Sequence, residues 1–210
     1  MSGSGGNIRV GKNGVWIVRI IAGTARGRTF EAPEGRSTRP TLDRVREAMF
    51  GMVQFDVADA EVLDLFAGSG ALGLEALSRG AKSAVFCDHN RKACSLIEKN
   101  VRNLGFFDKA EIACSDCFEL IRSLAKRNQR FSLVLLDPPY ESGLYEPVLR
   151  ELVSNNLLED GCIILAEHSK NAPLEPPVQE LSAGKPHRYG DVAVTKFTYH
   201  REIIVSEGLE

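Results

Sequence analysis

The chain has 210 residues, of which 43% are hydrophobic and 26% are charged, and its net charge is −2. This composition allows one folded domain with an ordinary core, and it argues against a disordered chain and against a generally basic nucleic-acid binder. No apolar run approaches the ~20 residues needed to span a bilayer, and the N-terminal residues lack the apolar stretch of a signal peptide, so we expect a cytoplasmic protein without membrane contact.

The first part of the chain is predicted to be an appendage to the main domain. Residues 1–16 are rich in glycine and polar residues, and we expect a flexible extension there. Residues 17–54 are expected to form a small unit of two strands and a helix. The strands, at 15–23 and 27–33, flank a glycine turn, and the helix, at 41–53, has apolar residues at helical spacing.

The charge is unevenly distributed. Residues 1–53 contain nine Lys or Arg residues and four acidic residues, whereas the remainder contains 17 basic and 24 acidic residues. Eight of the nine basic residues are arginines, whose planar guanidinium groups suit phosphate and base-edge contacts. This pattern favours a polyanionic partner for the N-terminal segment over a solvated basic surface.

The remainder, residues 55–204, is predicted to be one α/β domain. Apolar strands alternate with amphipathic helices, which is typical of a mostly parallel sheet with right-handed crossovers. The expected strands lie at 61–67, 83–88, 109–116, 131–140 and 161–168, and the helices at 71–80, 91–105, 117–128 and 144–156. Residues 185–202 look like a hairpin that turns near Gly190–Asp191. The predicted fold is Rossmann-like, with a seven-stranded sheet and an antiparallel edge hairpin.

A glycine loop joins the first strand and helix of this domain. Gly68, Gly70 and Gly73 give the spacing G-x-G-x-x-G, and Asp88 follows 20 residues after the first glycine. These features alone are compatible with an NAD-dependent oxidoreductase. Asp64 argues against it, because a carboxylate beside the glycine loop repels a pyrophosphate and attracts an ammonium group, such as the amino-acid end of S-adenosyl-L-methionine.

Acidic residues stand at the ends of four successive predicted strands. They are Asp64, Asp88, Asp116 and Asp137. Ligands of open α/β sheets bind at the carboxyl ends of the strands, so these carboxylates are expected to share one edge. Asp88 would bind ribose hydroxyls there, and Asp116 would bind the adenine amine or serve as a helix N-cap.

The sequence "LLDPPYESG" predicts an acceptor site at the end of the fourth strand. If a methyl donor lies at this edge, Asp137 and the carbonyl of Pro138 can each accept one N–H of a nucleobase amine. This directs the nitrogen lone pair toward the methyl group. Proline fixes the direction of the carbonyl, and Tyr140 can stack on the base, a contact worth ~1–3 kcal/mol. Alignment would be the main source of rate acceleration.

The five cysteines are odd in number and irregularly spaced, as in a reduced cytosolic protein. Cys114 and Cys117 form one C-x-x-C pair. A single pair is weak support for a metal or redox site, so we expect two half-buried side chains and no bound metal.

Several motifs together resemble a known family. "LDLFAGSGALGLEALSRGA" and "LLDPPY" resemble class I S-adenosylmethionine-dependent methyltransferases that modify exocyclic amines. The segments "RIIAGTARGRTFEAPEG", "TRPTLDRVREAMF" and "HRYGDVAVTKF" are similar to the bacterial methyltransferases of small-subunit (16S) ribosomal RNA that act on guanine N2. The resemblance extends from about residue 18 to residue 200.

The resemblance implies a cofactor, a substrate and a set of residues. The implied cofactor is S-adenosyl-L-methionine. The implied substrate is small-subunit ribosomal RNA within an assembled or assembling particle, and the protein is expected to act as a monomer. The implied catalytic residues are Asp137, Pro138, Pro139 and Tyr140. The implied cofactor-binding residues are Thr41, Asp64, Phe66, Gly68, Ser69, Gly70, Asp88, His89, Asp116, Cys117 and Asp137. The implied RNA-binding residues are Arg26, Arg28, Arg36, Arg39 and Arg44.

Other functions stay open at the level of the sequence. Methylation of adenine N6 or of a glutamine amide in a protein would use the same D-P-P-Y loop. The basic N-terminal segment disfavours a protein substrate. A non-catalytic RNA-binding assembly factor is a further alternative, and the intact strand-end carboxylates argue against it.

Overall fold

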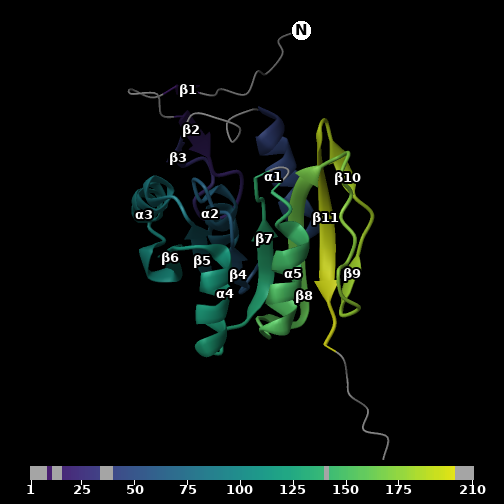
Figure 1. Ribbon diagram of the computed structural model, residues 1–210. Helices are drawn as coiled ribbons and strands as arrows, with labels where there is room; N and C mark the ends of the chain where they lie inside the picture. The colour runs from purple at the N-terminus through teal and green to yellow at the C-terminus, as the bar shows by residue number, and fades with distance from the viewer. Residues whose placement is uncertain (1–8, 11–15, 34–39, 140–141, 202–210) are drawn as a thin grey trace, which may run out of the picture.

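The computed structural model describes residues 9–10, 16–33, 40–139 and 142–201, which form two sheets and their covering helices (Figure 1). The smaller sheet is antiparallel, in the order β1 (Arg9–Val10), β2 (Trp16–Arg19) and β3 (Thr29–Ala32). The hairpin expected at 15–23 and 27–33 is therefore present with shorter strands. Most of the predicted flexible extension, residues 1–8 and 11–15, lies outside the described residues.

The larger sheet forms the centre of the molecule. Five strands are parallel: β4 (Glu61–Asp64), β5 (Ser83–Asp88), β6 (Ala110–Cys114), β7 (Phe131–Leu136) and β8 (Leu158–Ser169). Three strands are antiparallel: β9 (Leu181–Ala183), β10 (His187–Tyr189) and β11 (Val192–Tyr199). The continuous order is β10-β11-β8-β7-β4-β5-β6, and β9 pairs with β11 off this path.

The edge hairpin turns where the sequence predicted. Tyr189 pairs with Val192, which leaves Gly190 and Asp191 as a two-residue turn. Gly190 has a φ of 64°, a left-handed conformation that glycine adopts without steric cost. β9 was not expected, because its three residues show no alternating pattern.

Helices cover both faces of the sheet. One face carries α1 (Pro40–Met52), α2 (Ala71–Ser78) and α3 (Arg91–Leu104), and the other carries α4 (Cys117–Lys126) and α5 (Tyr145–Ser154). Figure 1 shows α4 and α5 in front of the sheet. A short 3-10 helix, η2 (Phe107–Lys109), follows α3. No helix in the described part of the chain is long and apolar enough to cross a membrane.

Local sequence explains where the helices begin and end. The side chain of Asn90 accepts a hydrogen bond from the Lys92 amide at 2.9 Å and so caps α3, and Gly105, with a φ of 79°, closes it. In α2, Gly73 allows close packing, since a Cβ there would lie 2.3 Å from the Phe86 ring. The third glycine of G-x-G-x-x-G therefore serves helix–strand packing.

Candidate functional site

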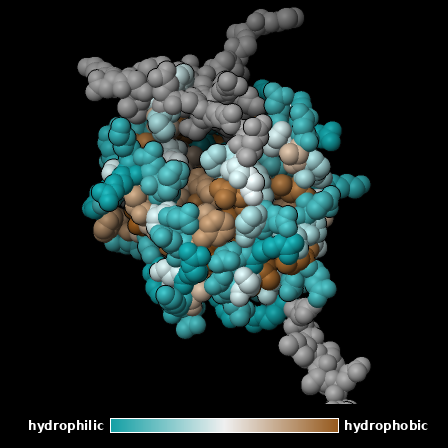
Figure 2. Space-filling view, viewed as in Figure 1, coloured by the Kyte–Doolittle hydropathy of each residue, from teal (hydrophilic) through white to brown (hydrophobic). Residues whose placement is uncertain are grey.

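The four acidic residues lie where successive strands end, along the carboxyl edge of the sheet. Asp64 ends β4 and Asp88 ends β5, while Asp137 and Asp116 follow β7 and β6. Because these strands are parallel neighbours, their ends meet at one edge, as the sequence predicted. The strands point toward the top of Figure 1, and hydrophobic residues gather around a hollow in the upper part of the same view in Figure 2.

Asp64 is a buried carboxyl group at the end of β4, facing the first turn of α2. Its side chain is 2% exposed and accepts a hydrogen bond from the Gly73 amide at 3.0 Å. Burial raises the pKa of Asp64 to about 7, although the backbone hydrogen bonds oppose the shift. A cation beside it would favour the ionised form, so the group is suited to the ammonium of an amino acid.

Asp88 holds the glycine loop in place. One oxygen accepts from the Gly68 amide at 3.0 Å and the other from the Asn90 amide at 2.8 Å. Each carboxylate oxygen has two lone pairs, so the group can also accept ribose hydroxyls. Gly68 has a φ of 56° and faces open space, which leaves room for a ligand against the backbone. The exposed His89 ring lies 3.8 Å from Asp88.

The other predicted residues of the glycine loop have different environments. Gly70, with a φ of 82°, is the N-cap of α2. Ser69 is buried, and Phe66 is partly buried against the α4–α5 face of the core. Since carboxylates take the amides of Gly68 and Gly73, a pyrophosphate would find two acids where it needs donors. The loop thus suits a cationic ligand better than a dinucleotide.

Asp116 is the N-cap of α4, the alternative that the sequence left open. Its Oδ1 accepts from the amides of Phe118 at 2.8 Å and Glu119 at 3.3 Å. Cys117, next along the chain, is buried, and burial raises the pKa of its thiol. Cys114 is exposed. No group of three metal-binding side chains occurs within the described residues.

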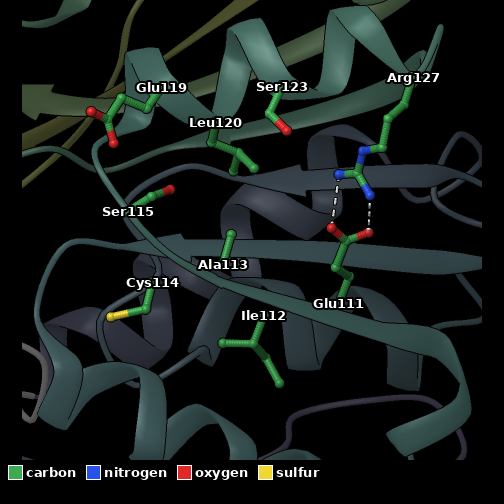
Figure 3. A pocket seen from close by; sticks show the side chains of 9 residues that line it. All are labelled: Glu111, Ile112, Ala113, Cys114, Ser115, Glu119, Leu120, Ser123 and Arg127. Atoms are coloured by element: carbon green, nitrogen blue, oxygen red, sulfur yellow. Dashed lines mark hydrogen bonds and ion pairs between the residues drawn. The ribbon is translucent and has the colours of Figure 1, made fainter.

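A shallow groove of about 470 Å³ runs along the open edge of the sheet, between β6 and α4 (Figure 3). The guanidinium of Arg127 forms two hydrogen bonds with the Glu111 carboxylate, at 2.8 and 3.2 Å, across this groove. Charged side chains on an edge strand discourage pairing with a further strand. The groove is a protected sheet edge, and the strand-end carboxylates lie outside its lining.

The D-P-P-Y loop leaves the sheet beside Asp64. Leu135 of β7 pairs with Asp64, the last residue of β4. Asp137 therefore lies two residues past the level at which β4 ends. Pro138 is buried, whereas Asp137 and Pro139 are exposed, and Tyr140 lies outside the described residues. The loop returns to the sheet at Tyr145, whose hydroxyl donates to the backbone carbonyl of Glu167 at 2.5 Å. Both ends of the loop are therefore anchored.

Glu75 fastens the N-terminal hairpin to the main domain, a role that sequence reasoning missed. Its fully buried carboxylate accepts from the amides of Ile21 at 2.8 Å and Ala22 at 3.0 Å, and from Arg79 Nε at 2.8 Å. Arg46 of α1, also buried, approaches it at 3.8 Å. The sequence signal that could have indicated this role is a glutamate among the apolar residues at the start of α2.

Ser78 provides a second attachment for the same hairpin. Its carbonyl accepts from the Thr24 amide at 2.7 Å, and its hydroxyl accepts from the Ala25 amide at 3.0 Å. Gly23 lies so close that a Cβ there would be 1.7 Å from the Ser78 carbonyl oxygen, and its φ is 85°. Only glycine fits this position. The "RIIAGTARG" motif is therefore shaped by docking on α2.

Asn100 connects the small sheet to the glycine loop. It is fully buried on α3, and its amide nitrogen donates to the carbonyls of Glu31 at 2.8 Å and Ser69 at 3.0 Å. Its amide oxygen accepts from the Glu31 backbone N–H at 3.0 Å. One side chain thus bridges β3 and the predicted cofactor loop.

The arginines predicted to bind RNA have different roles in the fold. Arg28 donates to the carbonyls of Leu104, at 2.8 Å, and Asn103 at the end of α3, which attaches the hairpin to that helix. Arg26 and Arg44 are exposed. Arg36 and Arg39, also predicted to bind RNA, lie outside the described residues. The side chain of Thr41, predicted to bind the cofactor, is not described either.

A family model described as "Conserved hypothetical protein 95" matches residues 18–198. The chain belongs to this family. It is 36% identical to "Putative rRNA methyltransferase YlbH" of Bacillus subtilis, over 82% of this chain and 94% of that protein. It is 39% identical to "Ribosomal RNA small subunit methyltransferase D" of Escherichia coli, over 71% of this chain and 74% of that protein.

Solved structures agree with this family assignment. "Putative methyltransferase yhhF from Escherichia coli" has a TM-score of 0.77 and 32% identity, and covers 88% of this chain and 98% of its own. The structure titled "Crystal structure of SMU.776, a putative methyltransferase complexed with SAH" has a TM-score of 0.71 at 13% identity, covers 90% of this chain and 57% of its own, and supports the fold.

These comparisons confirm the family and fold predicted from the sequence motifs. The protein is a class I methyltransferase by family and fold, and this fold is that of methyltransferases that use S-adenosyl-L-methionine. The carboxyl edge fits this cofactor, because Asp64 can neutralise an ammonium and Asp88 can accept ribose hydroxyls.

Proposed function

We propose that this protein transfers a methyl group from S-adenosyl-L-methionine to the exocyclic N2 amine of a guanine in small-subunit ribosomal RNA. The observation that carries the proposal is the placement of Asp137 and Pro138 at the carboxyl edge, directly beyond the end of β4 and Asp64. The relatives named ribosomal RNA small subunit methyltransferase D support the substrate class.

Each residue at this edge has a role in the proposed reaction. Asp64 and the glycine loop hold the amino-acid end of the cofactor, Asp88 holds the ribose, and Asp116 lies on the adenine side. The cofactor supplies a methyl group already activated on a sulfonium. Asp137 and the carbonyl of Pro138 accept the two N–H bonds of the target amine, Pro139 fixes the turn, and Tyr140 stacks on the base.

The amine nitrogen would form a bond to the methyl carbon as the carbon–sulfur bond breaks, S-adenosylhomocysteine would leave with the electron pair of that bond, and the proton lost from the nitrogen would pass to solvent. Asp137 contributes most in the transition state, where the nitrogen becomes tetrahedral and positive. Arg26 and Arg44 are exposed on the hairpin and on α1, and in this proposal they contact RNA phosphates. The substrate is RNA within a small-subunit particle in the cytoplasm, and the protein acts as a monomer.

Nucleoside mass spectrometry tests the proposal. Small-subunit particles from cells that lack this protein are incubated with the purified protein and labelled S-adenosyl-L-methionine. We expect labelled N2-methylguanosine, and we expect Asp137→Ala to lower kcat by ~10²–10³ with little change in cofactor affinity. N6-methyladenosine as the product would contradict the guanine assignment. The absence of any methylated nucleoside would favour a non-catalytic assembly factor.

A further inference from the structure

The exposed side of α3 and η2 carries a basic surface on an otherwise acidic domain. Residues 91–109 contain five Lys or Arg residues and two acidic residues, whereas the rest of residues 54–210 contains 12 basic and 22 acidic residues. All five cations are exposed. The basic α3 surface consists of Arg91, Lys92, Lys99, Arg102 and Lys109. Such a concentration of positive charge suits a polyanion.

The basic α3 surface leads away from the carboxyl edge of the sheet. Asp88 ends β5 at that edge, and α3 begins three residues later. Lys92 lies in the first turn of α3 and Arg102 in the last, about 15 Å further along the helix. The spacing of Lys92, Lys99 and Arg102, seven and then three residues, places them on one side of the helix.

The N-terminal hairpin adjoins the same surface. Lys99 donates to the Glu31 carboxylate of β3 at 2.6 Å, and Arg28 donates to the Leu104 carbonyl at the end of α3 at 2.8 Å. Figure 1 shows α3 next to β3. Arg26, two residues before Arg28, is exposed. The arginines of the hairpin turn therefore lie beside the far end of α3.

An exposed aromatic ring stands at this far end. Phe107 of η2 is 51% exposed, and the guanidinium carbon of Arg102 lies 4.3 Å from the centre of its ring, a cation–π contact. Arg102 also pairs with Glu98 at 2.9 Å, but both side chains are more than half exposed, and such a surface pair contributes little. The charge of Arg102 is thus available to a ligand that reaches the ring.

We propose that this face of the protein is a second contact with the substrate RNA, in which an unpaired base stacks on Phe107 beside Arg102 while Lys92 and Lys99 bind phosphates. The proposal rests on the proposed function, which makes RNA the substrate. Unpaired RNA bases stack on aromatic rings and on guanidinium planes. The stacked base would lie roughly 20 Å from the edge where methyl transfer takes place, since α3 spans that length.

The surroundings of Phe107 favour RNA over a protein partner. The centre of a protein interface is a cluster of apolar side chains from which charged residues are depleted. Phe107 is instead followed by Asp108 and Lys109 and lies against Arg102. One ring among charged residues does not supply such a centre, whereas one ring is enough to stack a base.

The test compares Phe107→Leu with Phe55→Leu in the full chain. Leucine keeps an apolar side chain but removes the aromatic face. Phe55 is the matched control, because it is 88% exposed and lies in the segment between α1 and β4, next to Asp56. The probes are protein-free small-subunit RNA and small-subunit particles, both from cells that lack this protein. We expect Phe107→Leu to weaken binding of both by about five-fold or more, and Phe55→Leu to stay within about two-fold of wild type.

Further measurements separate stacking from charge and from a role in the fold. Phe107→Trp keeps an aromatic face and should bind RNA within about two-fold of wild type. Replacing Lys92 and Lys99 together with Gln should reduce the salt slope of RNA binding by about two units, whereas Phe107→Leu should leave the slope unchanged. Because the stacked base is remote from the chemistry, Phe107→Leu should raise KM for the particles and leave kcat unchanged.

Three results would overturn the inference. The first is RNA and particle affinity within about two-fold of wild type in Phe107→Leu. The second is a loss of affinity for particles alone, which would indicate a protein partner on this face. The third is a loss of melting temperature or of S-adenosylhomocysteine affinity in parallel with RNA affinity, which would make Phe107 a structural residue.

The identity of the wild-type product tests the proposed function separately. If wild type forms N2-methylguanosine and Phe107→Leu binds RNA as well as wild type does, the inference about Phe107 fails and the proposed function stands. If wild type forms another product, the guanine assignment fails, and weakened RNA binding by Phe107→Leu still supports the stacking site.

Discussion

Replacing Glu75 should detach the N-terminal hairpin and destabilise the whole protein. The Glu75→Ala variant leaves the Ile21 and Ala22 amides and the Arg79 guanidinium without their acceptor. Arg46 loses its nearby countercharge as well. Breaking a buried, hydrogen-bonded ion pair by removing one partner costs about 3–5 kcal/mol, and we expect a loss of that size in the free energy of unfolding.

Urea unfolding at neutral pH measures this loss, and an exposed glutamate supplies the control. Glu146 pairs with Arg150 at 2.8 Å on the surface of α5, one turn apart. Glu146→Gln should change the free energy of unfolding by less than about 0.5 kcal/mol. Glu75→Gln keeps one acceptor oxygen and should fall between the two. If Glu75→Ala remains within ~1 kcal/mol of wild type, the buried carboxylate does not hold the hairpin in place.

Three other predictions concern the cofactor, the attachment of the hairpin and the RNA. Because the pKa of Asp64 is raised to about 7, pairing with an ammonium should release a proton below that pH, so cofactor affinity should rise from pH 5 to pH 7 and then level off. Calorimetry in two buffers of different ionisation enthalpy should detect this release in wild type and lose it in Asp64→Asn; equal heats in wild type would contradict the assignment. Arg28→Ala should lower the free energy of unfolding by roughly 1 kcal/mol, because Arg28 binds the end of α3. Arg26→Ala should leave the melting temperature unchanged and reduce the salt slope of RNA binding by about one unit; an unchanged slope would remove Arg26 from the interface.

The sequence predicted the features that depend on short-range patterns. The strand-end acids, the helix closed by Gly105 and the turn at Gly190–Asp191 all follow from local periodicity and turn chemistry. Each is decided by residues close together in the chain, and the structure places them as expected.

The sequence did not predict the roles that depend on distant partners. Glu75 binds amides more than 50 positions away, and Arg28 binds the carbonyl of Leu104, 76 positions away. The family resemblance implied that Arg28 contacts RNA, which stays a prediction, and no local pattern indicated that its guanidinium binds the end of α3.

The bridge made by Asn100 has a consequence for how the two substrates influence each other. Its one amide group holds both Glu31 of the small sheet and Ser69 of the glycine loop, so neither can shift without straining the bonds to the other. If RNA binds the small sheet and the cofactor binds the glycine loop, as we propose, rigidity that RNA confers on the sheet is shared with the loop. Thermodynamic linkage makes such an effect reciprocal: whatever factor RNA contributes to cofactor affinity, the cofactor returns to RNA affinity.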